Sequence, residues 1–235
     1  MRIFLITIIL MVGWSYTSTA QGFIFGPKGG ATFGIQNWNG FDREPLIAYH
    51  GAIYIESLNR NSLSSLYTQF GYHKRGSSED VFFFTGGGTG FRERQRFEFN
   101  NLALQFGAKR KVDSSSGNHL YYSFGFRLDY TLSHNLDQYE IYAGYFPISP
   151  YVNKFNYGAS VALGYEYNFS NLSGVIIEAS IHPDFSRQYE QPGGFSIISP
   201  ITGQGISLRE QSIRNITFEL SVGLKLVREI IYLDD

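Results

Sequence analysis

The stretch "HLYYSFGFRLDYTLS", residues His119–Ser133, decides the fold class of this chain. Every second residue is large and apolar, and the residues between them are mostly small, polar or charged. The apolar set is Leu120, Tyr122, Phe124, Phe126, Leu128, Tyr130 and Leu132, and the intervening set is Tyr121, Ser123, Gly125, Arg127, Asp129 and Thr131. A period of two is that of a β-strand, because successive side chains point to opposite faces of a sheet. The stretch therefore predicts a strand with one oily face and one face that carries charge.

Seven further segments alternate in the same way, while helical periodicity is nearly absent after residue 20. They cover about Phe23–Gln36, Leu46–Ser57, Leu63–Arg75, Arg96–Arg110, Phe155–Tyr167, Leu172–His182 and Ser212–Val227. These segments run for roughly 11–16 residues, against the usual five or six of a globular strand. A tilted strand needs about 9–11 residues to cross a bilayer. The lengths therefore favour strands that span a membrane.

The connections between these segments alternate in length. Short ones follow the second, fourth and sixth segments, at Leu58–Ser62, Val112–Asn118 and Asn168–Asn171. Longer ones follow the others, among them Gly76–Gln95 and Pro183–Glu210. Short periplasmic turns and long extracellular loops are typical of bacterial transmembrane barrels, which must close because a bilayer cannot hydrogen-bond an open sheet edge. We therefore expect an all-β fold, a closed eight-stranded antiparallel up-and-down transmembrane β-barrel.

The charged residues decide which face points inward. They share the phase opposite to the oily stripes, and they are Lys28, Glu56, Lys109, Arg127, Asp129, Glu166, Glu178, Glu219 and Lys225. In a dry protein core each unpaired charge would cost several kcal/mol, so this mixture fits a solvated or mutually paired lumen, with the oily stripes facing lipid. Eight strands leave room for side chains or one small ligand and not for an open channel. The alternative is a soluble lipocalin-like ligand-binding barrel, in which the apolar phase would point inward.

The start of the chain and its composition indicate where the protein is sent and which kinds of partner it has. Residues 1–20 combine Arg2, the apolar run Ile3–Trp14 and a small-residue exit ending at Ala20, which is the pattern of a cleaved secretory signal peptide. Residues 21–235 then form a single outer-membrane barrel domain. There are no cysteines, so disulfides cannot stabilise it. The formal net charge of −1 gives no reason to expect nucleic acid as a partner.

Four stretches resemble a known family in order and spacing. They are "FGPKGGATFG" (Phe25–Gly34), "SLYTQFGYHKRG" (Ser65–Gly76), "FNNLALQFGAKRKV" (Phe99–Val112) and "YGASVALGYEY" (Tyr157–Tyr167). They are similar to the first, third, fourth and sixth strands of the PorT-type outer-membrane β-barrels of the Bacteroidota. The likeness spans about Gly22–Val227. The chain lacks the proline of the family's fourth strand, and it continues past the last strand as "REIIYLDD" instead of ending on an aromatic residue.

The resemblance implies an eight-stranded barrel in the cell outer membrane, in contact with the lipid bilayer and lipopolysaccharide. Some members of the family look like accessory parts of a protein-secretion apparatus or of gliding machinery. We therefore expect a non-enzymatic structural or interaction subunit of a secretion or surface-assembly complex. The alternatives are an outer-membrane lipid-modifying enzyme and the soluble lipocalin-like barrel.

Three histidines are the candidates for a metal site or a general base. His50, His73 and His182 lie on the inward phase near the rim with the long loops. The hairpin of the second and third segments brings His50 and His73 together. We expect His182 to lie across the barrel, and no Cys or Asp is spaced to complete a ligand set. The sequence therefore predicts no metal and no cofactor.

A barrel enzyme needs a nucleophile beside a histidine near the outer rim. The conceivable pairs are Asp184 with His182, and Ser64 or Ser65 with His50. The two serines lie towards the opposite end of the third segment from His73, so their grouping fails on geometry, and no nucleophile stands out. We therefore expect no catalytic residue and no enzymatic activity.

Partner contacts are expected outside the membrane. The apolar run Val81, Phe82, Phe83 and Phe84 sits in the second long connection, where it packs within the loop, extends a strand above the membrane or contacts a protein partner. The glycine-rich Thr85–Gly90 beside it lacks the lysine and the helix of a phosphate-binding loop and is predicted to be a loop tip. The C-terminal tail after Val227 is a second candidate contact, on the periplasmic side.

Overall fold

A computed structural model describes residues 22–39, 43–59, 62–84, 90–112, 117–142, 149–194, 196–198, 203–207 and 210–229. The expected signal peptide, residues 1–20, and the end of the tail, residues 230–235, lie outside the described residues. Within the described ranges, no helix is long and apolar enough to cross a membrane.

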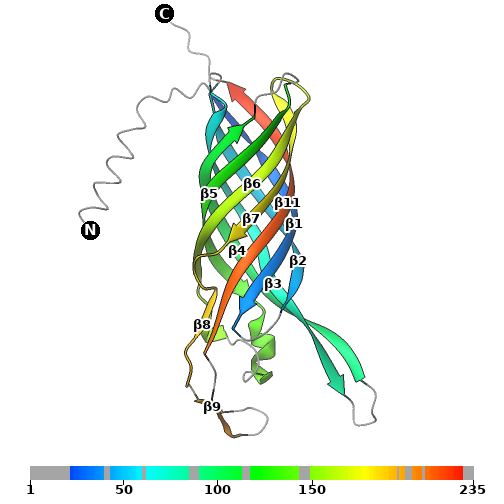
Figure 1. Cartoon of the computed structure of the whole chain (residues 1–235), viewed down its shortest axis with the longest axis vertical. Helices are drawn as coiled ribbons and strands as arrows, with labels where there is room; N and C mark the ends of the chain where they lie inside the picture. Colours follow the sequence, from blue (N-terminus) through cyan, green and yellow to red (C-terminus); the bar gives the residue numbers. More distant parts are fainter. Residues whose placement is uncertain are drawn as a thin grey trace, which may run out of the picture.

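Eight long strands form the body of the molecule. They are β1 (Gly22–Trp38), β2 (Glu44–Leu58), β3 (Ser64–Phe84), β4 (Gly90–Lys111), β5 (His119–His134), β6 (Phe155–Asn168), β7 (Ser173–Pro183) and β11 (Gln211–Glu229). From β1 to β7 each strand pairs antiparallel with the next, β7 pairs with β11, and β11 pairs back onto β1. The ring of hydrogen bonds is therefore closed, and the predicted up-and-down barrel is confirmed (Figure 1).

The remaining elements lie at the end of the barrel that carries the long connections (Figure 1). They are the 3₁₀ helices η2 (Leu136–Tyr142) and η3 (Ser149–Tyr151) and the short strands β8 (Tyr189–Gln191), β9 (Ser196–Ile198) and β10 (Gly205–Ser207). Strand β8 pairs with the start of β11, and β9 pairs with β10. The connection predicted at Pro183–Glu210 therefore contains short strands of its own.

The two phases of each strand face as the charges predicted. The apolar stripe of β5 is outside, where Phe124 is 55% exposed, and its charged phase is inside, where Arg127 is 1% exposed. The same alternation of buried and exposed residues runs along β1, β6 and β11. Because the outer surface is oily and the lumen holds the charges, the lipocalin-like alternative does not fit this barrel.

The β3–β4 hairpin corrects one prediction. Gly76–Gln95 was expected to be a loop, but β3 runs to Phe84 and β4 begins at Gly90, in register from Ser64↔Arg110 to Phe84↔Gly90. The paired strands continue beyond the barrel and project from its mouth (Figure 1). Of the three readings of the apolar run, strand extension is the one observed, while residues 85–89 lie outside the described part of the chain.

Gly76 lies where this hairpin leaves the barrel wall. Its φ is +154°, and a Cβ atom there would lie 1.7 Å from the carbonyl oxygen of Phe97 on β4. Only glycine allows the two backbones to approach so closely at this point.

An apolar cap closes the mouth. It consists of Trp38, Phe97, Phe99, Leu136, Tyr139, Tyr189 and Ile213, contributed by barrel strands, by η2 and by β8. The rings of Trp38 and Phe97 meet edge-on at 5.0 Å, and the guanidinium of Arg43 lies 3.6 Å from the centre of the Trp38 ring. The long connections therefore fold back onto inward-facing aromatic residues and cover the lumen below.

Candidate functional site: the polar lumen

The lumen is filled by ionic contacts at its short-turn end. Glu166 on β6 accepts hydrogen bonds from the Nζ atoms of Lys109 and Lys225, each at 2.5 Å. Lys109 also donates to Glu56 at 2.7 Å, and Nζ of Lys111 lies 3.3 Å from Glu166. Because these side chains come from β2, β4, β6 and β11, the contacts tie together strands that do not pair with one another.

A second ion pair lies beside this group. Lys28 on β1 donates to Glu178 on β7 at 2.5 Å, and the hydroxyl of Tyr121 donates to the other oxygen of Glu178 at 2.7 Å. A cavity of about 20 Å³, bordered by these residues and by Tyr54 and Gln69, has room for about one water molecule. The lumen at this level is therefore packed and offers no channel.

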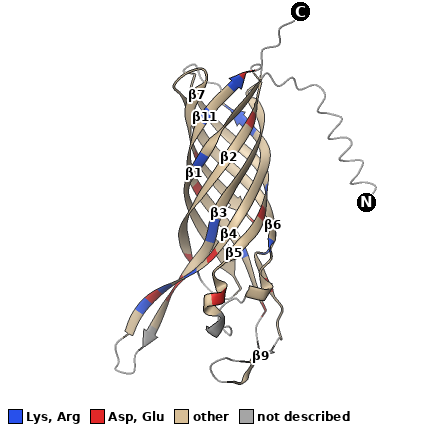
Figure 2. Cartoon of the chain, turned by 180° about the vertical axis from the view of Figure 1, so that it is seen from behind, with Lys and Arg blue, Asp and Glu red and all other residues tan. Residues whose placement is uncertain are grey.

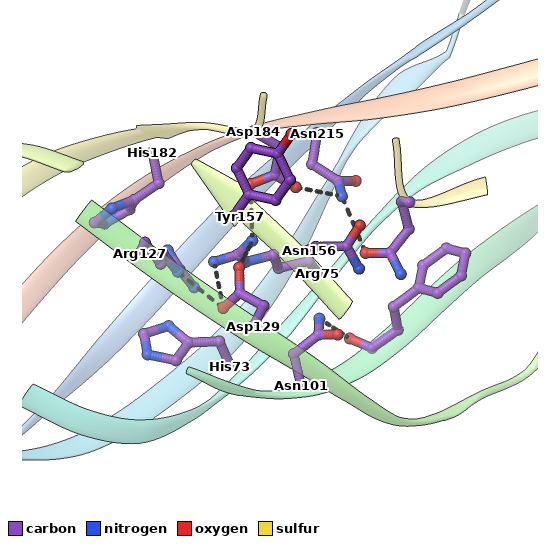
Figure 3. A network of polar contacts seen from close by, with 12 residues as sticks. His73, Arg75, Asn101, Arg127, Asp129, Asn156, Tyr157, His182, Asp184 and Asn215 are labelled. Atoms are coloured by element: carbon purple, nitrogen blue, oxygen red, sulfur yellow. Dashed lines mark hydrogen bonds and ion pairs between the residues drawn. The ribbon is translucent and has the colours of Figure 1, made fainter. Parts of the chain in front are cut away.

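An arginine–carboxylate network lies in the lumen next to the apolar cap, since Arg75 pairs with the cap residue Phe99 (Figure 3). Arg75 donates through Nη1 to Asp129 at 2.9 Å and to Asp184 at 3.3 Å. Arg127 donates through Nε to Asp129 at 3.0 Å, and Asn215 donates to Asp184 at 2.9 Å. Buried charges are retained when they are paired in this way.

The three histidines gather around one carboxylate, that of Glu219 on β11. His73 Nδ1 lies 2.7 Å from Oε1 of Glu219, His182 Nε2 lies 3.3 Å from Oε2, and His50 Nε2 lies 3.9 Å from Oε2. His50 and His73 face each other across the β2–β3 ladder with ring centroids 5.3 Å apart and an interplanar angle of 4°. The predicted approach of His50 to His73 is confirmed.

His182 lies across the barrel from that pair, as expected. Strand β7 pairs with neither β2 nor β3, but the lumen is narrow enough for His182 to reach the same carboxylate. Glu219 supplies the acidic group that the search for Cys or Asp overlooked, although its place on the inward phase was visible in the sequence. The expectation that no metal binds here stays a prediction.

The serines considered for catalysis lie where the sequence predicted. Ser65 Oγ donates to Glu56 at 2.7 Å at the short-turn end of β3, away from His73, and Asp184 contacts Arg75 instead of His182. Two buried Ser–His contacts were not predicted: Ser221 Oγ lies 2.8 Å from His50 Nε2, and Ser180 Oγ lies 2.9 Å from His182 Nε2. Neither histidine has a carboxylate on its Nδ1 atom, since His50 Nδ1 contacts Thr32 and His182 Nδ1 has no hydrogen-bond partner among the described residues.

Three charged lumen residues were missed by the sequence reasoning. Arg75 follows His73 by two positions, so continuing the alternation would have placed it inside. Lys111 continues the inward phase of Lys109 in the same way. Asp184 follows the inward-facing His182 by two positions, so the same alternation would have placed it inside, one residue beyond the end of β7.

The hairpin carries a second set of charges, outside the lumen (Figure 2). Asp80 on β3 forms ion pairs with Arg92 and Arg94 on β4, and Arg94 also pairs with Glu44. Arg43 pairs with Glu79. These contacts hold the base and the side of the hairpin in place.

Comparison with known proteins shows the fold and no closer relationship. No family model matches the chain, and no curated protein matches it. Neisserial surface protein A is similar over 87% of this chain and 96% of its own, with a TM-score of 0.50 and 11% identity. The outer membrane protein OprG from Pseudomonas aeruginosa is similar over 88% of this chain and 96% of its own, with a TM-score of 0.50 and 10% identity. The closed barrel, its oily outer belt and its charged lumen make this chain an outer-membrane β-barrel protein in contact with the lipid bilayer.

Proposed function

We propose that this protein is a non-enzymatic interaction subunit, which uses the barrel as a membrane anchor and the β3–β4 hairpin as its contact with a protein partner. The resemblance of four strands to PorT-type barrels of the Bacteroidota supports a role in a secretion or surface-assembly complex. The packed lumen supports an anchor in preference to a pore, because paired charges and the apolar cap fill the space through which a solute would pass.

The observation that carries this proposal is the open edge of the projecting hairpin. The ladder between β2 and β3 ends at Glu44↔Ser78, so among the described residues no strand pairs with the outer edge of β3 from Glu79 to Phe84. An edge with unpaired backbone groups is a template for an added strand. Proteins bind extended segments of their partners in this way, with backbone hydrogen bonds for affinity and side chains for selectivity.

The side chains of the hairpin fit a partner with both apolar and charged groups. Phe82 is 62% exposed, with the guanidinium of Arg92 5.6 Å from its ring centre. Val81 is half-buried, and Asp80 lies beside the same edge. The charged side chains beside this edge limit unspecific pairing with the strands of other proteins, while Phe82 offers a hydrophobic contact to the partner.

The test shortens the hairpin without changing its register. Residues 81–93 are replaced by a two-residue Asn-Gly turn between Asp80 and Arg94, which already pair. We expect the shortened barrel to fold and to lose the protein that co-purifies with the unchanged chain in mild detergent. A matched control removes the β9–β10 tip, residues 196–207, and keeps the partner. Equal recovery of the partner with both variants would contradict the proposal.

Two further readouts separate this function from its alternatives. The proposal predicts no conductance in planar bilayers. It also predicts an unchanged lipopolysaccharide profile when His50 or His73 is replaced by alanine, whereas an altered profile would favour the lipid-modifying enzyme.

A further inference from the structure

We propose that the lumen contains a binding site for a divalent transition metal of the Zn²⁺ class, formed by His50, His73 and Glu219 with His182 beside them. This site is separate from the hairpin and does not depend on the proposed partner. The sequence predicted no metal, because it showed the histidines without the carboxylate that joins them.

The first support is convergence. His50, His73 and Glu219 come from β2, β3 and β11, and one ligand atom from each lies within 4.8 Å of the other two. With Zn²⁺ bonds of about 2.0–2.2 Å, tetrahedral ligands lie about 3.3 Å apart. Side-chain shifts of about an ångström or somewhat more would therefore bring the three atoms onto one ion.

The second support is a buried nitrogen without a partner. His73 is 1% exposed and its Nδ1 contacts Glu219, but its Nε2 has no hydrogen-bond partner among the described residues. His182 Nδ1 is in the same situation. An unsatisfied buried polar atom is costly and calls for an explanation such as an unseen water or ion. A metal ion bound at Nε2 of His73 would supply the missing partner of that nitrogen.

The third support is the orientation of His50. Its Nδ1 lies 3.0 Å from Thr32 Oγ1, while its Nε2 lies on the side of Glu219 Oε2. A hydrogen bond from Nδ1–H to an oxygen acceptor fixes the tautomer whose Nε2 can bind a metal. The ion would take the place of the Ser221 hydroxyl, which now lies 2.8 Å from Nε2.

The fourth support is the balance of charge. The arginines Arg75 and Arg127 face three carboxylates, those of Asp129, Asp184 and Glu219, which leaves one negative charge in excess. A proton on a histidine or a metal cation would balance it. Arg127 approaches Oε1 of Glu219 at 3.6 Å, whereas His50 and His182 approach Oε2, so an ion on the Oε2 side avoids the guanidinium.

The ligand chemistry selects the metal. Imidazole nitrogens with one carboxylate suit Zn²⁺, Cu²⁺ or Ni²⁺, whereas Ca²⁺ and Mg²⁺ prefer sites made of oxygen atoms. Bound at this point, the ion would connect strands on different sides of the lumen and stabilise the closed barrel.

The experiment uses the tag-free mature chain, folded into detergent with and without equimolar Zn²⁺ and then passed over a desalting column. Elemental analysis measures the amount of metal bound per chain. A difference in gel mobility between unheated and heated samples verifies that each sample is folded. We expect about one Zn²⁺ per barrel, no retained Ca²⁺ or Mg²⁺, and a higher urea midpoint for the zinc-loaded sample.

Variants test the assignment of ligands. His73→Asn and His50→Asn should each lower the Zn²⁺ affinity by more than about 100-fold, and Thr32→Val by about 10-fold, since partners of a ligating histidine contribute about 10–100-fold. The matched control His119→Asn removes a histidine at the short-turn rim and should leave the affinity unchanged. Retention of Zn²⁺ by the double variant His50→Asn, His73→Asn would overturn the proposal. Failure of the unchanged folded chain to retain Zn²⁺ would also overturn it and would assign the excess charge to a proton.

Discussion

Neutralising one buried carboxylate should destabilise the barrel more than any surface ion pair does. Glu166 is 0% exposed and lies within 2.5 Å of Lys109 and Lys225 and 3.3 Å of Lys111. Glu166→Gln keeps the shape of the side chain and leaves Lys109 and Lys111 with Glu56 as their remaining carboxylate partner. Lys225 keeps only the hydrogen bond to the amide oxygen of Asn168 among its described contacts. At an effective dielectric constant of about 20, a single contact of unit charges at 4 Å is worth about 4 kcal/mol, and removing one partner of a buried pair costs about 3–5 kcal/mol.

The free energy of unfolding should therefore fall by about 3–5 kcal/mol in Glu166→Gln. With a urea dependence of about 3 kcal/mol/M, the midpoint of unfolding falls by roughly 1–1.7 M. The assay follows Trp38 fluorescence, in lipid vesicles, of the chain produced without residues 1–20. Adding Lys225→Met to Glu166→Gln removes one of the stranded positive charges and should restore at least about 1 kcal/mol, because the two sites are coupled.

The control for this prediction is Glu190→Gln, which breaks the exposed pair with Arg187 and should change the stability by less than about 1 kcal/mol. A loss below 1 kcal/mol in Glu166→Gln itself would refute the reasoning, since it would mean that water screens the lumen charges.

Two further predictions concern the outer face and the base of the hairpin. Phe126→Arg places a charge at the middle of the oily stripe and should make folding into vesicles less favourable by about 2–4 kcal/mol. Phe82→Arg, beyond the mouth, should change the free energy of folding by less than about 1 kcal/mol. Equal effects of the two substitutions would mean that both residues lie in the same medium. Gly76→Ala would bring a Cβ atom to 1.7 Å from the Phe97 carbonyl oxygen and should loosen the hairpin and the cap. The measurement is the rate of proteolysis at Arg92 and Arg94, which should rise. In the control Gly51→Ala the new Cβ atom meets nothing within 4 Å, and the rate of proteolysis should stay unchanged.

The sequence was sufficient for the barrel because lipid acts on every strand in the same way. Each outward position must be apolar, so the alternation in His119–Ser133 and its seven counterparts directly reports the direction of the side chains. The inward charges such as Arg127 and Asp129 were located for the same reason.

The sequence was insufficient where no lipid sets the pattern. Beyond the membrane both faces of the β3–β4 hairpin are free of hydrocarbon, so Gly76–Gln95 shows no clean alternation and resembles a loop. The apolar cap could not be predicted either, because Leu136 and Tyr139 come from a connection whose path depends on the finished barrel.

The contacts inside the lumen depend on registers between strands that are not neighbours. The alternation of apolar and polar residues predicts that Glu219 and His182 point inward. It does not predict that their side chains approach to 3.3 Å. The hairpin rule located His50 and His73 together because β2 and β3 pair directly. The missing part of the candidate site was therefore the part that crosses the barrel.

In this barrel the oily phase of the strands faces hydrocarbon and the charged phase faces the lumen. Tyr121 and Tyr122 test it directly, because they are adjacent on β5 and are 1% and 50% exposed, on opposite phases. In a Trp38→Phe background of the chain produced without residues 1–20, Tyr122→Trp and Tyr121→Trp each introduce one fluorophore. Lipids brominated at several depths of the acyl chain quench the fluorophores that they touch. We expect strong quenching for Tyr122→Trp and weak quenching for Tyr121→Trp, and the reverse order, or equal quenching of both, would contradict the account.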